Sequence, residues 1–346
     1  MLHTNSKVAG TNRKVMGRHL LVAVAGFGMS LAALAAQTAP NLPGRVLNGT
    51  TKQPVAHVVV EFVLLQQGMA SAGTATTDTQ GKFRFDGPEF AGRPALLRVD
   101  YQGATYSHVL QPLPDPQPEV EIPVYDADRQ PGLVTATEHI IFLQPTGDTL
   151  WVVEEVLLEN RSSPPKTYVN TEGTFRFLVP EQVREGVKVF VEGPGGMPLN
   201  QPPIPKDKPG SFAISYPLRP GQTQVHLEYA LNYQSPFAFS KSLEVAAERT
   251  HIVTPGQGVQ VQGETLVSEG TEPTTGFLAY RITPVSNQLR LQISGQAVMP
   301  DSAAGDAAAA PGGLVPILDP VSQRRTWILV LLGMVLLGGL VYHYTR

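Results

Sequence analysis

Alternating apolar and polar positions recur through the middle of the chain. From Gln224 to Tyr233 the sequence reads Q-V-H-L-E-Y-A-L-N-Y, in which every second residue is apolar or aromatic. Because successive side chains of a strand point to opposite faces of a sheet, this spacing predicts a strand with one buried face. The same pattern predicts strands at 82–86, 174–179 and 288–294. Glycine, proline, asparagine and aspartate separate these runs, and no amphipathic helix of three turns stands out, so we expect an all-β protein with two β-sandwich domains in tandem.

An apolar segment near the N-terminus interrupts this pattern. Residues 19–36 are almost entirely apolar, follow four basic residues, and end in A-L-A-A. A basic start, an apolar centre and small residues at the end are typical of a secretory signal peptide, which we expect over residues 1–36 with cleavage near Ala35 or Ala36. An uncleaved signal anchor is the alternative. In either case the residues that follow are expected to be exported.

A second apolar segment, W-I-L-V-L-L-G-M-V-L-L-G-G-L-V-Y, runs from Trp327 to Tyr342 without a charge. In a helix its length is about 24 Å, slightly short of a bilayer's hydrocarbon core, and aromatic residues stand at both ends. We therefore predict a single transmembrane helix over 327–344; the alternative, a buried core helix, is disfavoured because the segment has no polar face and follows a linker.

The orientation of this helix rests on the signal peptide. Arg324 and Arg325 precede the helix and only Arg346 follows it, which runs against the positive-inside tendency. The large domain before the helix must already have been translocated, however. We expect a single-pass protein of the cell membrane, with its ectodomain in the periplasm or outside the cell and a short tail in the cytoplasm.

Proline-rich and polar stretches mark the domain boundaries. P-L-P-D-P-Q-P at 112–118 disfavours a helix and precedes one short predicted strand at 119–125, after which D-A-D-R-Q-P-G follows. The expected domains are thus 42–126 and 133–296. Residues 297–326 are rich in alanine, glycine and proline and are expected to form a flexible linker to the membrane helix. Residues 194–209, with several prolines, are predicted to be a long loop without regular structure.

The first domain carries a recognisable set of turns. It reads P-G-R-V-L-N-G-T-T-K-Q-P-V at 43–55, has an apolar run at 58–65, and continues with T-T-D-T-Q-G-K-F-R-F at 76–85. This resembles the carboxypeptidase regulatory-like family, a small transthyretin-like (prealbumin-like) sandwich, over about 85 of the 346 residues. Asp78 is suited to accept backbone N–H groups, Gly81 to supply a positive φ, and Phe83 and Phe85 to point inward.

The resemblance implies a fold rather than a reaction. Its matching positions are structural in the family, whose related modules are non-catalytic appendages of exported enzymes, receptors and surface proteins, and some fold relatives bind starch or other glycans. The peptidase that gives the family its name would need an H-x-x-E arrangement, which this sequence lacks. The second domain is not recognised.

Composition narrows the possible chemistry. The chain has 33 glycines, 31 prolines and no cysteine, so disulfides, thiolate metal sites and cysteine nucleophiles are excluded. The net charge is −3, and four of the basic residues lie in the predicted signal peptide, so a nucleic-acid partner is not expected. A large exported chain without cysteine suits a bacterial envelope.

No catalytic motif is evident. The eight histidines are scattered without metal-ligand spacing, and H-E-x-x-H, G-x-S-x-G and G-x-x-x-x-G-K-[ST] are all missing. Glu154 and Glu155 are adjacent, so a strand would turn them to opposite faces, and acid–base catalysis would require another carboxylate facing one of them. We predict no catalytic, metal-binding or cofactor-binding residue and no cofactor.

Aromatic residues offer the remaining candidate site. Tyr229, Tyr233, Phe237 and Phe239 would form a binding surface for a sugar or a protein if their rings were exposed. The alternative is that they belong to the core, since Tyr229 and Tyr233 share the apolar face of their strand.

The function expected from these observations is a non-enzymatic, exported, membrane-tethered binding or scaffolding protein of the cell envelope. Its expected partners are the lipid bilayer, through the C-terminal helix, and another envelope protein or a glycan. A carbohydrate-binding surface protein is the alternative. A hydrolase that uses carboxylates is a lesser one.

Overall fold

The computed structural model describes residues 41–298, apart from 66–67, 88–89, 91–93, 111–117, 131, 185, 196–197, 274–275 and 284–286. Within these residues the protein is all-β, without an α-helix. No helix in this part of the chain has the length and apolar character needed to cross a membrane. The predicted signal peptide (1–36), nearly all of the linker and the predicted transmembrane helix (327–344) lie outside the described residues.

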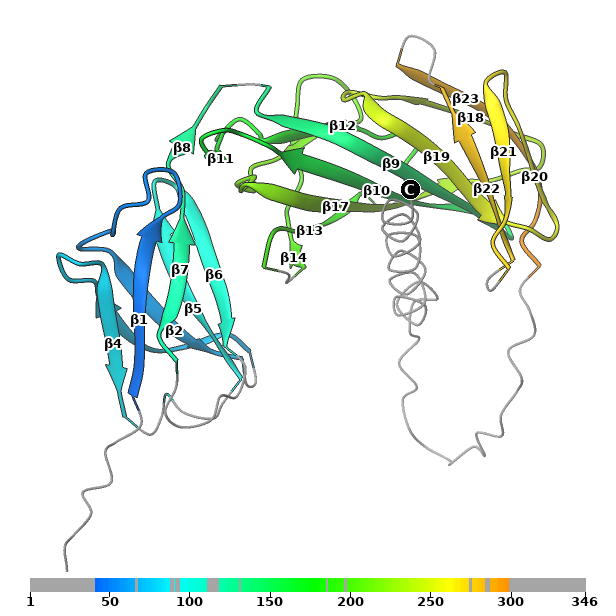
Figure 1. Cartoon of the computed structure of the whole chain (residues 1–346). Helices are drawn as coiled ribbons and strands as arrows, with labels where there is room; N and C mark the ends of the chain where they lie inside the picture. Colours follow the sequence, from blue (N-terminus) through cyan, green and yellow to red (C-terminus); the bar gives the residue numbers. More distant parts are fainter. Residues whose placement is uncertain are drawn as a thin grey trace, which may run out of the picture. The chain divides into compact units, whose positions relative to one another are not determined.

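The first part of the chain forms an N-terminal sandwich of two sheets (Figure 1). One sheet has the order β4-β1-β7, in which β1 is antiparallel to β4 and parallel to β7. The other has the order β3-β2-β5-β6 and is antiparallel throughout. The strands are β1 (Asn41–Asn48), β2 (Val59–Leu64), β3 (Ala70–Thr76), β4 (Lys82–Asp86), β5 (Ala95–Tyr101), β6 (Ala104–Leu110) and β7 (Val120–Val124).

Alternation explains the core of this sandwich. In β4 the burial pattern is strictly alternating, so Phe83 and Phe85 point inward while their polar neighbours face solvent. Phe85 meets Phe62 of β2 from the other sheet, with ring centroids 5.6 Å apart. A core of apolar residues from both sheets therefore holds the layers together.

The turn before β4 has the contacts that its sequence predicts. Asp78 Oδ1 accepts hydrogen bonds from the backbone N–H groups of Gln80 and Lys82, both at 2.8 Å. Gly81 has a φ of 71°, and a Cβ at this position would lie 2.6 Å from the carbonyl oxygen of Val46. Both the backbone conformation and the close approach of β1 thus require glycine here.

The second part of the chain forms a C-terminal sandwich around an eight-stranded sheet, called here the large sheet. Its order is β14-β13-β17-β10-β9-β19-β22-β21, and only β9 and β19 pair in parallel. Its strands are β9 (Val134–Thr146), β10 (Thr149–Asn160), β13 (Lys188–Glu192), β14 (Leu199–Asn200), β17 (Gly221–Asn232), β19 (Ala247–Pro255), β21 (Leu266–Thr271) and β22 (Phe277–Ile282).

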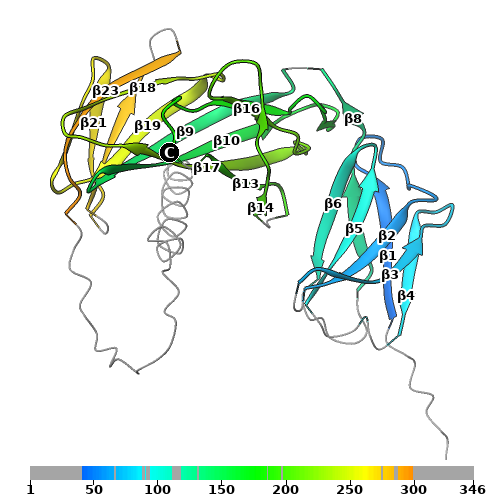
Figure 2. The ribbon, with the colours of Figure 1, turned by 180° about the vertical axis from the view of Figure 1, so that it is seen from behind.

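Smaller sheets provide the rest of this sandwich, as Figure 2 shows from behind. They have the orders β12-β16-β15 and β18-β23-β20. Their strands are β12 (Phe175–Leu178), β15 (Ile204–Pro205), β16 (Ser211–Ile214), β18 (Phe237–Ser242), β20 (Val259–Gln262) and β23 (Gln288–Gly295). A short parallel pair joins β8 (Ala127–Asp128) to β11 (Thr167–Tyr168).

The long strands β9, β10 and β17 give the large sheet two distinct faces. Their inward residues belong to a core that also includes residues of both smaller sheets. We call the side toward this core the inner face, and the opposite side the outer face. The inner face contains the residues that the alternation in β17 predicts to be buried, among them Val225, Leu227 and Leu231.

One expectation about the loops is wrong. Residues 194–209 were predicted to lack regular structure, but they contain the two-residue strands β14 and β15. Strand β14 pairs with β13, and β15 pairs with β16. Prolines are compatible with such short edge strands because an edge leaves some backbone N–H groups without a ladder partner.

Candidate functional site

Four polar side chains meet inside the core of the C-terminal sandwich. They are Glu154 of β10, His139 of β9, Tyr229 of β17 and Lys241 of β18, called here the core cluster. The side chains of Glu154 and Lys241 are only 1% and 2% exposed. Charged groups are rarely this buried unless they are paired, so their partners decide what the cluster can do.

The strand register brings three of these residues together on the inner face. Glu154 lies opposite Leu227 of β17 and Ile141 of β9. Tyr229 and His139 are each two residues from those partners, so they flank Glu154 diagonally on the same face. Lys241 reaches the cluster from β18, a strand of the opposing layer.

Both oxygens of the Glu154 carboxylate are occupied. Oε1 accepts a hydrogen bond from the Tyr229 hydroxyl at 2.6 Å and lies 2.8 Å from Lys241 Nζ. Oε2 lies 2.7 Å from His139 Nε2. Lys241 Nζ also donates to the carbonyl oxygen of Leu178 and lies 5.8 Å from the centroid of the Tyr229 ring.

The environment keeps Glu154 ionised. Burial by itself would raise the pKa of this carboxyl, but the ammonium of Lys241 and the hydrogen bond from His139 lower it to about 2. The same carboxylate, together with burial, raises the pKa of Tyr229 well above its ordinary value. At neutral pH the cluster therefore holds a buried carboxylate with a neutral phenol as donor.

The space beside the core cluster is too small for a substrate. A cavity of about 20 Å³ is lined by His139, Glu154 and Lys241, among others. Such a volume holds roughly one water molecule. Glu154 contacts an imidazole, a phenol and an ammonium group there, and Glu244 also lines the cavity.

A second group of polar side chains lies on the outer face of the large sheet. Glu155 points to this face, as expected for the neighbour of Glu154 in a strand. Its Oε1 contacts His226 Nδ1, and its Oε2 accepts a hydrogen bond from the side chain of Gln224 at 2.9 Å. Glu228 Oε1 lies 2.7 Å from His226 Nε2, so the imidazole sits between two carboxylates.

This arrangement keeps His226 charged. Burial would lower the pKa of the imidazole, but the hydrogen bonds and charges of Glu155 and Glu228 raise it to about 9. A histidine held between two carboxylates in this way is an ion-pair bridge across β10 and β17. Among the described residues no group of three or more histidine, aspartate or glutamate side chains is arranged to hold a metal ion.

A groove of ligand size adjoins the cavity beside the core cluster in the C-terminal sandwich, because Phe175, Arg176, Glu244 and Val245 line both. Its volume is about 360 Å³, within the range typical of small-molecule pockets. Its lining includes Tyr168, Asn170, Arg176 and Glu244 together with apolar side chains such as Leu158 and Phe175. The lining of the groove thus combines an aromatic ring, an amide, one positive and one negative charge, and several apolar side chains.

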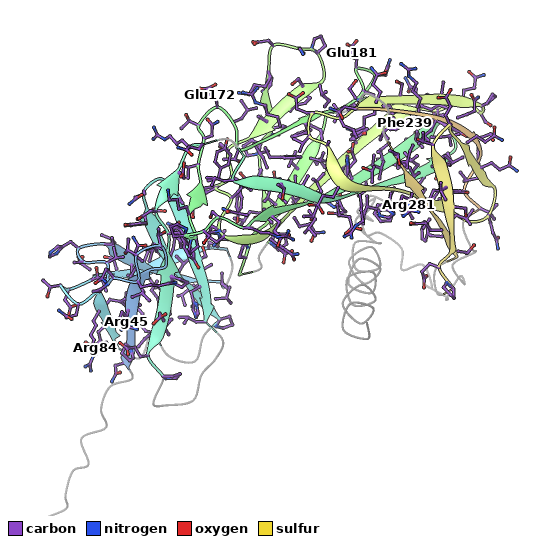
Figure 3. The ribbon with its side chains drawn as sticks, turned by 45° about the horizontal axis from the view of Figure 1, so that its top comes forward. Arg45, Arg84, Glu172, Glu181, Phe239 and Arg281 are labelled. Atoms are coloured by element: carbon purple, nitrogen blue, oxygen red, sulfur yellow. The ribbon has the colours of Figure 1, made fainter. Side chains whose placement is uncertain are left out.

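The predicted aromatic surface is not formed. Tyr229, Tyr233 and Phe239 are 4%, 5% and 1% exposed, and all three belong to the core of the C-terminal sandwich. Phe239 lies among the strands of this sandwich, whereas Glu172 and Glu181 stand on its surface (Figure 3). Phe237 is half-buried and packs against Tyr233, with ring centroids 5.8 Å apart. The ring faces of the three buried residues cannot stack on a ligand, because the opposing layer covers them.

The core cluster was not predicted from the sequence. Its members are far apart in the chain, and only the pairing of β9, β10 and β17 and the packing of β18 bring them together. A weak signal existed: His139 and Lys241 each occupy an apolar position of an alternating run, T-E-H-I-I-F-L for His139 and F-A-F-S-K for Lys241. A charged residue in phase with apolar neighbours predicts a buried polar contact, though not its partner.

No family model matches the chain, and no curated protein is detectably similar to it.

Proposed function

We propose that this protein is a non-enzymatic, exported, membrane-tethered binding or scaffolding protein of the cell envelope. The export and the tether rest on the apolar segments at 19–36 and 327–342. The resemblance of residues 43–85 to carboxypeptidase regulatory-like modules agrees with a role as an appendage rather than an enzyme.

The groove lined by Tyr168, Asn170, Arg176 and Glu244 is the observation that carries the binding role. Its volume suits a peptide side chain or a sugar unit, and its charged and aromatic groups supply the contacts that orient such ligands. The cavity beside the core cluster has a volume of only about 20 Å³, which holds roughly one water molecule. The conspicuous titratable groups are therefore structural in this proposal, and recognition takes place at the groove.

A pull-down with the full chain tests the proposal. Detergent-purified protein is incubated with solubilised envelope material, and the wild type is expected to retain a specific component that Arg176→Ala loses. Arg281→Ala is the matched control, because Arg281 is an exposed arginine of β22 that does not line the groove. Equal retention by all three proteins, or turnover of a substrate, would contradict the proposal.

A carbohydrate ligand is the second candidate, and the groove rather than the β17–β18 aromatics now supports it. The Tyr168 hydroxyl accepts a hydrogen bond from the Asn170 amide at 3.4 Å, so a ring and an amide stand side by side in the lining. On a glycan array, binding by the wild type and its loss in Tyr168→Ala would favour a sugar. Stacking on an aromatic ring contributes about 1 kcal/mol, which corresponds to roughly a five-fold loss of affinity.

A further inference from the structure

Lys241 and Glu154 are held together at a depth where burial by itself disfavours both of their charges. Their side chains are almost completely buried, and Nζ lies 2.8 Å from Oε1. The shared cavity is lined mainly by apolar and aromatic residues, including Phe175, Phe177 and Leu227. An ion pair in such surroundings loses hydration that the attraction between its members does not always replace.

Both partners are fixed from opposite layers. Glu154 lies in the middle of β10, which pairs with β9 on one side and with β17 on the other. Only a shift of the strand register by one residue would turn its side chain away from the core. Lys241 lies on β18, which pairs with β23, and its amino group is also anchored by the carbonyl oxygen of Leu178. The amino group and the carboxyl group are therefore held in contact within one molecule. For well-oriented intramolecular reactions the effective concentration of one group at the other reaches about 10⁵ to 10⁸ M.

Tyr229 and His139, the other members of the core cluster, each contact one oxygen of the Glu154 carboxylate. Tyr229 donates to Oε1, where negative charge would develop if Cδ were attacked. His139 Nε2 lies 2.7 Å from Oε2, the oxygen that would leave. An imidazole at this position can deliver a proton to a leaving oxygen.

From this geometry we propose that Lys241 and Glu154 join in an intramolecular amide bond that covalently links β18 to β10. The Lys241 ammonium first gives one proton to the Glu154 carboxylate, whose Oε1 it contacts, which leaves a neutral amine and a carboxylic acid. The Nζ lone pair then attacks Cδ while Tyr229 stabilises the charge on Oε1. Nζ gives up a second proton, both protons end on Oε2, which lies beside His139 Nε2, the Cδ–Oε2 bond breaks, and one water molecule leaves.

The overall reaction converts one ammonium and one carboxylate into one amide and one water, so it needs no oxidant, metal or cofactor. It removes two buried charges from the core, and the neutral amide that replaces them is less costly to bury. The cavity beside the cluster, at about 20 Å³, has room for a molecule of the size of the water released.

The amide bond would be a covalent cross-link between two sheets of this chain. With no cysteine, the protein cannot form a disulfide. A link between β10 of the large sheet and β18 of the opposing layer would close the sandwich across its core, as a disulfide does in other exported domains.

Mass spectrometry of the full chain tests the proposal directly. Trypsin cleaves an unlinked chain after Lys241 and yields peptides 207–241 and 242–249, with Glu154 in peptide 130–161. The linked chain is expected to lose cleavage at Lys241 and to yield a branched species of 130–161 and 207–249 that is about 18 Da, one water, lighter than the sum of its parts. Fragmentation must place the link on Glu154 rather than on Glu155. Wild-type protein that gives only the unlinked peptides overturns the proposal.

The same digest contains an internal control. Lys166 Nζ lies 2.9 Å from Asp128 Oδ2, a spacing close to that of Lys241 and Glu154, but the lysine side chain is 37% exposed. This pair is expected to stay unlinked, so peptide 162–166 is released normally. A link at Lys166 as well would show that proximity alone produces the signal and would overturn the role of the buried cluster.

Conservative variants separate chemistry from structure. In Lys241→Met the branched species must disappear, and in Tyr229→Phe and His139→Gln the linked fraction is expected to fall at least ten-fold shortly after synthesis. The wild-type digest does not depend on whether these variants fold. If soluble Tyr229→Phe and His139→Gln proteins are both linked as fast as the wild type, the roles assigned to these two residues are wrong.

Discussion

Individual residues in this protein have roles that depend on which face of a strand they occupy. Glu154 and Glu155 are neighbours in sequence, yet one lies in the core with Lys241 and the other on the outer face with His226. The lysine lowers the pKa of the first carboxyl, and the imidazole takes its own high pKa from the second. Identical side chains thus serve two different electrostatic networks because a strand alternates its faces.

A pH dependence of stability follows for His226. Its folded-state pKa, about 9, is above the ordinary value of 6.5, so the charged imidazole favours the folded state. This stabilisation is fully present below about pH 6.5 and is lost as the pH rises through 9. Urea denaturation at pH 6, 8 and 10 should show the loss in the wild type. In His226→Gln the part of the pH dependence between 6 and 10 should be much smaller, and equal curves for the two proteins would contradict the assignment.

The turn at Gly81 gives a prediction with a matched control. Gly81→Ala is expected to lower the free energy of unfolding by about 2 kcal/mol or more, because alanine disfavours a positive φ and its Cβ would approach Val46. Gly103 also has a positive φ but nothing within 4 Å of an added Cβ, so Gly103→Ala should cost only about 1 kcal/mol. Chemical denaturation of both variants measures the difference. Equal losses would mean that the close approach of β1 is unimportant.

At the scale of elements, alternation was a reliable guide to strands. The run at 82–86 coincides with β4, and the runs at 174–179 and 288–294 overlap β12 and β23. Alternation also showed that Tyr229 of β17 and Tyr233, which directly follows the strand, share an apolar face. The sequence could not show what covers that face, because the covering layer comes from strands distant in the chain.

Two phenylalanines of β18 test this burial. Phe239 is fully buried and Phe237 half-buried, so Phe239→Ala should cost about 3 to 5 kcal/mol and Phe237→Ala about 1 kcal/mol. Thermal or urea denaturation of the two variants provides the comparison. A surface role for Phe239 would instead give little loss of stability and a loss of ligand binding.

At the scale of the whole molecule, the buried apolar side chains of the described residues form two hydrophobic cores. One gathers residues between Leu42 and Val124, and the other gathers residues between Ala136 and Ile293. The domain boundaries at 42–126 and 133–296 stay predictions from the sequence. They rest on the proline-rich stretch at 112–118, which separates two sets of alternating runs.

The proposed tether is testable in cells. Full-length protein should remain in the membrane pellet after alkaline carbonate extraction, and a chain ending at residue 326 should be released, because it lacks the uncharged apolar segment 327–342. Protease added to spheroplasts should digest the region 41–298 from outside. Protection of this region in intact spheroplasts, with digestion only after lysis, would place it in the cytoplasm and contradict the proposed export.

The sequence by itself determines the local structure of this protein. Strand positions, the Asp78–Gly81 turn and the inward faces follow from alternation and turn chemistry, which act over a few residues. The core cluster, the two short strands within 194–209 and the groove beside Tyr168 were decided by tertiary structure. The core cluster and the groove depend on pairings between segments tens of residues apart, such as β10 with β17, whereas the short strands β14 and β15 depend on their neighbours β13 and β16. A single sequence contains the periodicity that buries a side chain, but the identity of its partner is fixed only when separate strands pack together.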